Sequence, residues 1–413
     1  MKQLLDRIHL YLANCKGETY AFCHCHWYRA RIPYRVWKLR HKSQIKVLFV
    51  VSEVSMWKTE TLYQLMLSHP RFQPYILPVG DITKHDADIE VKTYCNGKGY
   101  DYVQLGLDET IQSRIAPDII FYQQAYPKFI DDKYFEMNNR ESLFCHVNYC
   151  FQNTVTTNSL NRPLQNIAWM VFSENQICAD EIAPIMDNKG CNLKVTGLPF
   201  MDELLLSKEH YPDPWKLQER RKKRIIYAPH HSFMPEDLVS WSSFLQNGEF
   251  ILSLAKKYSD ETQWVFKPHP FLEPKLRKVW GDEKTEWYFN EWRTLPNTQM
   301  VDGGYYDVFK HSDAMLHDCG SFLLEYQYTG NPVMFLHSSQ PLKNIRLNKF
   351  SEMSKSLHYQ AYKNEEIESF LQMVIGGEDP MKDKRQAFFK EAFIPPYGKS
   401  ASQNIIDAIL GTK

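Results

Sequence analysis

Short apolar runs rich in β-branched residues recur along the first half of the chain, and polar or amphipathic stretches separate them. Residues 45–51, with the sequence IKVLFVV, are almost entirely apolar, as in a strand buried on both faces of a parallel sheet. Residues 57–67 then space their apolar side chains as an amphipathic helix does. This alternation is typical of a doubly wound parallel sheet. Further strands are predicted at 74–78, 119–122, 143–147 and 167–172.

A second series of apolar runs follows residue 224 and predicts another sheet, with strands at 225–228, 264–266, 298–301, 314–317 and 333–336. The segment before it is charged, contains two prolines and ends in the run ERRKKR, as a linker does. Whether the last helix crosses back to the first domain stays open. We therefore expect an N-terminal arm at 1–43, an α/β domain at 44–206, a linker at 207–224 and a second α/β domain at 225–413.

Composition supports two folded domains. The chain has 413 residues, of which 43% are hydrophobic and 14% aromatic, and this excludes a disordered protein. Basic and acidic residues both number 49, so no overall field favours a nucleic-acid partner. The nine cysteines are scattered and no secretory signal opens the chain, which indicates a reducing cytoplasm. No run approaches the roughly 20 apolar residues of a membrane-spanning helix, so we expect any membrane contact to be peripheral.

Residues 27–42 differ from the rest of the chain. They contain six basic and four aromatic residues and no acidic one. Such a segment could dock on an anionic lipid surface, where each basic side chain contributes about 1 kcal/mol. A solvated positive arm and a helix packed on its own protein are the alternatives. The basic residues are Arg29, Arg31, Arg35, Lys38, Arg40 and Lys42, and the aromatic ones are Trp27, Tyr28, Tyr34 and Trp37.

The string Cys23-His24-Cys25-His26 offers four side chains that can bind metals. Neighbouring ligands at this spacing do not easily face one ion, and no second cluster has the spacing of a zinc site. We therefore predict no metal.

Polar residues follow three predicted strands of the second half at the point where each strand ends. His230 and His231 follow the first strand, and Lys267 and His269 follow the second. A third group begins at His317. A single histidine after a strand is more often structural, but three groups at the carboxyl edge of one sheet favour a ligand site.

The third group, HDCGS at 317–321, joins a strand to a helix. Free backbone N–H groups and the helix dipole attract an anion such as phosphate at such a turn, which contains Gly320 and Ser321. Glu325 lies one helical turn further on, near the place of a ribose attached to that phosphate. Alternatively, Gly320 only makes a turn and Glu325 faces solvent. Asp318 is interpreted as a capping or orienting residue rather than a metal ligand.

These motifs resemble a known family. The strings Tyr227-Ala228-Pro229 and Lys267-Pro268-His269-Pro270, and the pattern across 312–333, are similar to the carboxyl-terminal motifs of the CDP-glycerol glycerophosphotransferases of the teichoic-acid polymerase type. The resemblance covers roughly residues 190–340. It implies a GT-B fold, in which two Rossmann-like doubly wound domains face each other across a cleft, and it implies no cofactor.

The resemblance also implies an activity. Glycerol phosphate, or another polyol phosphate, would pass from a CDP-linked donor such as CDP-glycerol to a cell-surface glycan or a lipid-linked acceptor, and CMP would leave. By position, His269 resembles the family's second essential histidine, Ser321 its donor-phosphate serine and Glu325 its ribose-binding acid. The other residues expected on the donor side are Lys267, His230, His231, Asp318 and Gly320.

One motif of the family is missing. Its amino-terminal Trp-His-Gly, which carries the expected catalytic base, has no literal match, and the equivalent place is 145–151. There His146 could act as the base, or Tyr149 could line the acceptor side. A GT-B glycosyltransferase that uses a nucleotide sugar and an inactive nucleotide-binding relative are the alternative functions. We expect a cytoplasmic enzyme, attached peripherally to the inner face of the cell membrane through residues 1–43.

Overall fold

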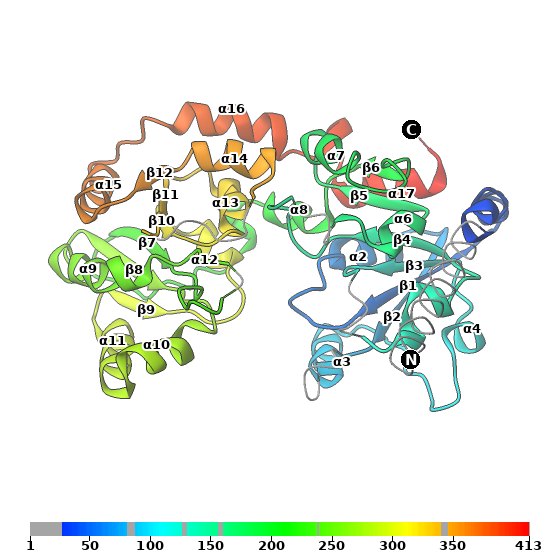
Figure 1. Ribbon diagram of the computed structural model, residues 1–413, viewed down its shortest axis with the longest axis horizontal. Helices are drawn as coiled ribbons and strands as arrows, with labels where there is room; N and C mark the ends of the chain where they lie inside the picture. Colours follow the sequence, from blue (N-terminus) through cyan, green and yellow to red (C-terminus); the bar gives the residue numbers. More distant parts are fainter. Residues whose placement is uncertain are drawn as a thin grey trace, which may run out of the picture. The chain divides into compact units, whose positions relative to one another are not determined.

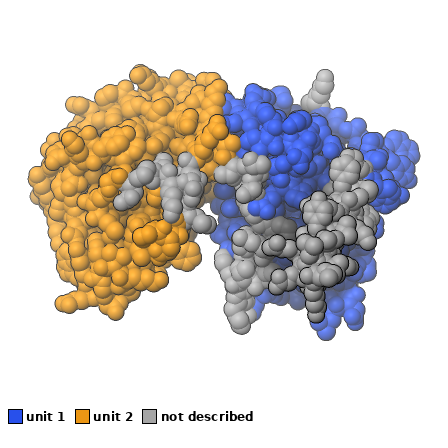
Figure 2. All heavy atoms as spheres, in the orientation of Figure 1, with its two compact units in different colours: residues 1–150, 157–200, 395–413 blue, residues 151–156, 201–394 orange. Residues whose placement is uncertain are grey.

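The computed structural model describes residues 27–80, 87–125, 130–155, 160–237, 239–339 and 346–412. The chain divides into two compact units, shown in different colours in Figure 2. The first comprises Met1–Cys150, Thr157–Phe200 and Pro395–Lys413, and the second comprises Phe151–Thr156 and Met201–Ile394. The carboxyl-terminal helix therefore belongs to the first unit.

The first unit is built on a parallel sheet with the strand order β2-β1-β3-β4-β5-β6 (Figure 1). The chain moves outward from β1 to β2 and then returns to add β3 on the other side of β1. The order of the strands thus reverses between β1 and β3. The strands are β1 (Ile45–Val51), β2 (Phe72–Pro78), β3 (Ile119–Tyr122), β4 (Leu143–Val147), β5 (Met170–Ser173) and β6 (Leu193–Val195).

Helices connect these strands. The last one of the chain, α17, lies against α2, and the hydroxyls of Thr61 and Ser402 are 3.0 Å apart there. The helices are α2 (Glu60–Ser68), α3 (Ala87–Lys98), α4 (Ile111–Arg114), α6 (Pro163–Ile167), α7 (Gln176–Ile182), α8 (Pro199–Leu204) and α17 (Ala401–Leu410), with 3₁₀ turns η2 (Asp132–Tyr134), η3 (Glu136–Asn138) and η6 (Pro396–Gly398). The chain passes from the first unit to the second within α8.

Residues 27–40 form a helix that packs on the first unit through one side. Tyr28 is buried, stacks on Phe144 with ring centroids 4.7 Å apart and donates a hydrogen bond of 2.8 Å to the carbonyl of Ser142. Leu39 is also buried. The segment is therefore not a free arm. Across the described residues, no helix combines the length and apolar character that crossing a bilayer requires. The string at 23–26 lies outside the described residues.

The second unit has its own parallel sheet, with the order β12-β11-β10-β7-β8-β9. Here the order reverses between β7 and β10. Ala228 pairs with His317 across these strands, and Tyr227 pairs with Phe266 of β8 on the other side. The strands are β7 (Lys223–Ala228), β8 (Thr262–Phe266), β9 (Thr298–Met300), β10 (Ala314–His317), β11 (Val333–Leu336) and β12 (Tyr359–Ala361).

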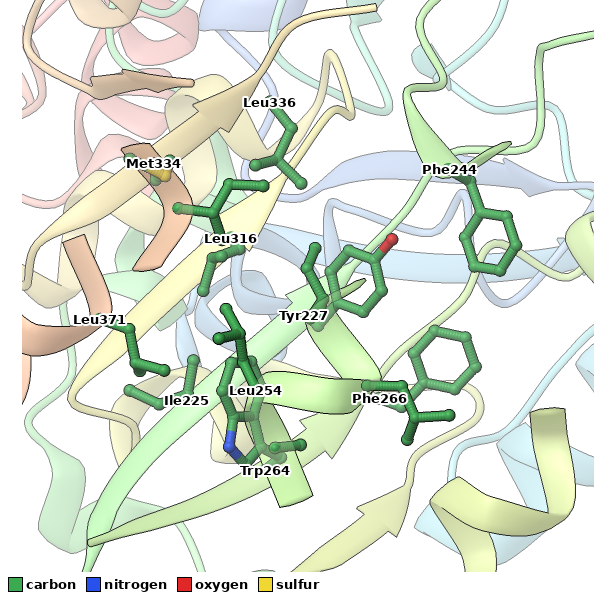
Figure 3. Close-up of a cluster of buried hydrophobic side chains, with 14 of the residues drawn as sticks. Ile225, Tyr227, Phe244, Leu254, Trp264, Phe266, Leu316, Met334, Leu336 and Leu371 are labelled. Carbon is green, nitrogen blue, oxygen red and sulfur yellow. The ribbon is translucent and has the colours of Figure 1, made fainter. Parts of the chain in front are cut away.

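A core of aliphatic and aromatic side chains holds this sheet against its helices (Figure 3). Tyr227, Phe266 and Trp264 are fully buried, and Phe266 stacks on Trp292 with centroids 4.9 Å apart. Such packing holds the strand ends in place. The helices are α9 (Phe244–Lys257), α10 (Leu272–Trp280), α11 (Asp282–Thr294), α12 (Tyr306–Lys310), α13 (Phe322–Glu325), α14 (Lys349–Ser356), α15 (Asn364–Gly376) and α16 (Lys382–Ala392), with η4 (Lys208–His210) and η5 (Tyr326–Thr329).

The predicted α/β class with parallel sheets is confirmed. The strand predicted at 167–172 begins later, because residues up to Ile167 form α6. The segment expected as a linker lies in the second unit, where Trp215 is 4% exposed and the backbone N–H of Lys216 donates to the side chain of Gln299 at 2.7 Å.

Candidate functional site

Three loops with polar side chains leave the carboxyl edge of the second sheet, after β7, β8 and β10. Parallel strands end at the same edge, so the registers of Ala228 with His317 and of Tyr227 with Phe266 place the three loops side by side. The edge includes the reversal point between β7 and β10. Open α/β sheets bind their ligands at such a point.

The loops after β7 and β8 bring three histidines together. The ring centroids are 4.4 Å apart for His230 and His231, 5.1 Å for His230 and His269, and 4.1 Å for His231 and His269. The backbone N–H of His269 donates to the carbonyl of Pro229 at 3.1 Å, and this bond ties the two loops. We call His230, His231 and His269 the histidine cluster. The sequence predicted that these groups would meet at one edge, and they do.

Backbone donors decide the tautomers of two of these rings. The N–H of Phe271 donates to Nδ1 of His269 at 3.1 Å, and the N–H of Ser232 lies 3.2 Å from Nδ1 of His230 and donates to it. The Ser232 hydroxyl lies 2.7 Å from the same Nδ1 and accepts from the N–H of Trp241. A ring nitrogen that accepts from a backbone N–H carries no proton, so the proton of each neutral ring is on Nε2.

The histidine cluster is neutral at pH 7. Burial, together with repulsion from its two neighbours and Lys275, lowers the pKa of His230 to about 3. Burial and the nearby His231, Lys275 and Lys267 lower the pKa of His269 to about 4. The pKa of His231 is lowered too, mainly by burial. Each ring is therefore a neutral group, and two of them present an N–H.

The geometry of the histidine cluster also indicates whether it would bind an anion or a metal ion. The three rings each offer a nitrogen within 4.8 Å of the others, which is close enough to surround an ion. A metal needs a lone pair on the ligating nitrogen and an acceptor for the proton on the other one. In His230 and His269 the backbone N–H groups donate to Nδ1, so the proton is on Nε2 and that nitrogen has no lone pair for a metal. The histidine cluster therefore suits phosphate oxygens better than a cation.

Lys267 adds a positive charge beside the histidine cluster. Its ammonium group donates to the carbonyl of Gly303 at 3.0 Å and lies 5.0 Å from the centre of the Tyr305 ring. Burial lowers its pKa, while nearby acidic groups such as Asp302 and Glu325 act in the other direction. The lysine thus has capacity for a further acceptor, because an ammonium has three donors.

Glu325 does not face solvent. It is 5% exposed, and its carboxylate accepts a hydrogen bond of 2.5 Å from the hydroxyl of Tyr305. Tyr305 thereby links the predicted ribose-binding acid to the predicted phosphate-binding lysine. The sequence did not single out Tyr305, which follows two glycines in the loop after β9.

Asp318 joins the loops at this edge. One carboxylate oxygen accepts from the backbone N–H of His230 at 2.5 Å, and the other accepts from the N–H and the hydroxyl of Ser243 at 2.6 and 2.9 Å. Burial raises its pKa to about 7, and the three donated bonds oppose that shift. The Asp318 carboxylate therefore connects the loop after β7 to Ser243, the residue before α9.

The turn after β10 is tightly packed. A Cβ atom at Gly320 would meet the amide nitrogen of Asn153 at 3.0 Å and the ring of Trp241 at 3.1 Å, so a larger residue would fit only if these side chains shifted. Ser321 is partly exposed and directly precedes α13, which is only four residues long and continues as η5. The helix predicted after this turn is thus a single α-turn followed by a 3₁₀ turn.

His146, the candidate base, lies in the first unit within β4. It is 3% exposed, and its Nδ1 lies 3.1 Å from the carbonyl of Tyr122 and donates to it. Burial lowers its pKa to about 4. Tyr149 follows the same strand and is partly exposed. The role of either residue stays a prediction.

Lys275 is a further charged group that sequence reasoning missed. It lies in α10, forms an ion pair with Asp237 and acts on the pKa of all three histidines. It follows the Lys267-Pro268-His269-Pro270 motif closely in the sequence, and its ion pair with Asp237 holds it over the loop after β7.

No family model matches the sequence, and no curated protein matches it. Solved structures do resemble it. The S. aureus protein MnaA, in a structure with UDP, has a TM-score of 0.57 and 15% identity over 89% of this chain and 96% of that one. UDP-GlcNAc 2-epimerase of Neisseria meningitidis, bound to UDP-GlcNAc, has a TM-score of 0.56 and 15% identity over 89% and 100%.

The wall teichoic acid polymerase TagF resembles the chain over 95% of its length and 97% of TagF, with a TM-score of 0.54 and 15% identity. The fold is GT-B. Two six-stranded parallel sheets with interleaved helices agree with this result. At such identities the likeness establishes the GT-B fold alone.

Proposed function

We propose that this GT-B protein is an enzyme that transfers glycerol phosphate, or another polyol phosphate, from a CDP-linked donor to a glycan or lipid-linked acceptor and releases CMP. The observation that carries the proposal is the histidine cluster, where His230 and His269 hold their protons on Nε2 beside the ammonium group of Lys267. These groups suit the diphosphate of a nucleotide donor. The structural likeness to TagF and the resemblance of the motifs to those of CDP-glycerol glycerophosphotransferases support the choice of donor.

The reaction needs no covalent intermediate. An acceptor hydroxyl attacks the phosphorus nearest the polyol, the bond from that phosphorus to the bridging oxygen of CMP breaks, and the hydroxyl proton passes to a general base. Neutral N–H donors on His269 and His230 stabilise the negative charge that grows on the leaving phosphate, without any change of their protonation state. Ser321 and Gly320 contact the donor phosphates, and Glu325, positioned by Tyr305, contacts the ribose.

His146 is the proposed general base. His146 has a free lone pair on Nε2 when Nδ1 donates to the Tyr122 carbonyl, and this is the tautomer that a base needs. Its pKa of about 4 makes it a weak base. Tyr149 lines the acceptor side in this proposal.

A nucleotide sugar is the second candidate donor. Two of the similar structures hold UDP and UDP-GlcNAc, respectively. The histidine cluster and Lys267 would serve the diphosphate of either class of donor. Release of nucleotide separates the candidates, because a polyol phosphate transferase leaves a nucleoside monophosphate and a glycosyltransferase leaves a nucleoside diphosphate.

The test is an incubation with CDP-glycerol, CDP-ribitol and UDP-GlcNAc in separate reactions with a membrane extract as acceptor. We expect CMP from one of the CDP donors and no UDP. Release of UDP alone would replace the proposal with the glycosyltransferase. Binding of CMP without turnover of any donor would indicate the inactive relative.

The exposed face of helix 27–40 is the proposed contact with an anionic membrane surface. Trp27, Arg31, Tyr34 and Lys38 follow one another at helical spacing, and Trp27, Tyr34 and Trp37 are 47%, 64% and 58% exposed. Arg31 stacks on the Trp27 ring at 3.3 Å. We call this set of five residues the aromatic-basic face. Aromatic rings and basic groups together are typical of interfacial helices.

A further inference from the structure

The first unit has a buried polar group at the reversal point of its own sheet. Ser52 and Glu53 follow β1, and Gln123 and Gln124 follow β3, which is the neighbour of β1 across that point. Their exposed fractions are only 7%, 7%, 5% and 6%. Buried side chains of this kind normally have complete hydrogen bonds.

One side chain of this group, Gln124, has a buried acceptor atom without a described partner. The amide nitrogen of Gln124 donates to the hydroxyl oxygen of Ser52 at 3.1 Å, but the buried amide oxygen of Gln124 accepts from no described group. Gln123 differs, because its amide oxygen accepts from the backbone N–H of Lys58 at 2.5 Å. Gln124 therefore offers an acceptor that the described protein leaves unused.

A small cavity lies against these side chains. Its volume is about 10 Å³, and its wall includes Ser52, Glu53, Gln123, Gln124 and the ring of Tyr122. Such a volume holds one water molecule or one hydroxyl group. Among the residues that the structure describes, no lysine or arginine lines it, and the Glu53 carboxylate would repel an anion, so phosphate is a poor ligand.

We infer that the cavity binds one hydroxyl group of the acceptor, which is a polyol or a sugar. An alcohol both donates and accepts, and the site offers the matching partners. The Gln124 amide oxygen would accept a hydrogen bond from the hydroxyl of the ligand, while the Ser52 hydroxyl would donate one to the oxygen of the ligand. That this ligand is the acceptor of a transfer reaction rests on the proposed function.

The experiment measures polyol binding to the full chain by saturation-transfer NMR, with glycerol, ribitol and methyl N-acetyl-β-glucosaminide as probes. Gln124→Met keeps the length of the side chain and removes its amide. We expect at least one probe to bind the wild type and to bind this variant roughly tenfold more weakly. Gln64→Met, the same change at an exposed position on α2, is the matched control and should bind as the wild type does.

Thermal unfolding is recorded on the same samples. Replacing Gln124 by Met should leave the melting temperature unchanged or raised, because a buried acceptor without a partner is removed. If that variant does not fold, Ser52→Ala carries the test, since it deletes one hydroxyl only. Equal binding by the folded variant and the wild type, or no binding of any probe to the wild type, overturns the inference.

CMP binding is measured in parallel and reports on the second unit. A chain that binds a polyol through Gln124 but binds no CMP would contradict the proposed function and keep the hydroxyl site. A chain that binds CMP and no polyol would keep the proposed function and contradict the hydroxyl site.

Discussion

For single residues, the position of one proton decides the chemistry of the histidine cluster. An imidazole with a free Nε2 lone pair can take a proton or bind a metal, whereas one with the proton on Nε2 can only donate a hydrogen bond. The backbone N–H of Phe271 enforces the second state on His269, and the backbone N–H of Ser232 does so on His230. We therefore assign His269 to charge stabilisation rather than to proton abstraction.

This assignment makes a prediction for substitutions of His269. His269→Ala should lower the turnover number by roughly 100-fold or more, because one donor to the leaving phosphate is lost. His269→Gln places an amide N–H near the position of Nε2 and should recover part of that loss. Steady-state release of CMP measures both, and His210→Ala, an exposed histidine of the same unit, is the control. A glutamine variant as slow as the alanine variant would contradict a role as donor.

The pH dependence follows from the same pKa values. A histidine with its pKa lowered to about 4 is already neutral throughout pH 5.5–8, so protonation of His269 or of His230 should not limit the rate in that range. As the pH falls through those lowered pKa values, Nδ1 gains a proton and can no longer accept from the backbone N–H, while Nε2–H remains a donor. The wild-type rate could instead depend on a group with a pKa of 6 to 7. Loss of that pH dependence in His269→Ala would show that the ring acts as a base.

At the scale of elements, β10 is held by an aspartate at each end. Asp318, after the strand, accepts from the backbone N–H of His230 at 2.5 Å and from Ser243. Asp313, before the strand, accepts from the backbone N–H of Arg224 at 2.7 Å. The two carboxylates make similar bonds to the β7 segment, but only Asp318 stands at the ligand edge.

The pair allows a matched experiment. In Asp318→Asn the amide nitrogen cannot accept, so either His230 or Ser243 loses its partner, at a cost of about 1–3 kcal/mol in unfolding free energy. The same substitution at Asp313 should cost a similar amount. Only Asp318→Asn should also weaken CMP binding, by roughly tenfold, because the loop of His230 shifts. Urea unfolding and calorimetric titration with CMP measure the two effects. Equal CMP affinity in both variants would leave Asp318 a purely structural role.

The sequence predicted the elements well where burial alone determines them. Residues 314–317 and 333–336 are apolar at nearly every position, and both form strands with those limits. The edge strand β12 was missed, because Tyr359, Gln360 and Ala361 are too few and too polar for an apolar run. Edge strands bury less surface, so the pattern that marks central strands is weak in them.

The sequence predicted which loops form the candidate site but not the contacts between their side chains. Because parallel strands end together, the order of the motifs was enough to expect His230 and His269 at one edge. The sequence could not predict that Tyr305 and Lys275 lie at the site, because each comes from a segment whose direction depends on tertiary packing. The tautomers also depend on backbone geometry that residue types do not encode.

For the whole molecule, the numbers of acidic and basic residues are equal, but residues 27–42 contain basic residues and no acidic one. The structure separates the six basic residues of 27–42, so they do not act as one patch. Lys42 pairs with Asp118 at 2.5 Å, and Arg29 lies 3.2 Å from the sulfur of Cys191. Arg31 and Lys38 remain exposed among the aromatic side chains. The proposed membrane contact is therefore narrower than the sequence predicted.

This arrangement favours point substitutions over deletion as a test of membrane binding. Removing the helix would expose the pocket of Tyr28, whose ring is 1% exposed, and would destabilise the first unit. Replacing Trp37 and Tyr34 by Ser, together with Arg31 and Lys38 by Gln, changes the aromatic-basic face and leaves the buried side intact. We expect this variant to lose most of its co-sedimentation with vesicles that contain anionic lipid.

Two controls make the result specific. Trp287→Ser with Lys256→Gln alters another exposed tryptophan with a neighbouring lysine, in the second unit, and should bind as the wild type does. Binding of the wild type should also weaken as salt rises from 0.1 M to 1 M, where the Debye length falls from about 10 Å to about 3 Å. Because Arg31 and Lys38 supply the attraction, the variant of the aromatic-basic face should show little salt dependence. Equal binding by that variant and the wild type at low salt would remove helix 27–40 from the proposed membrane contact.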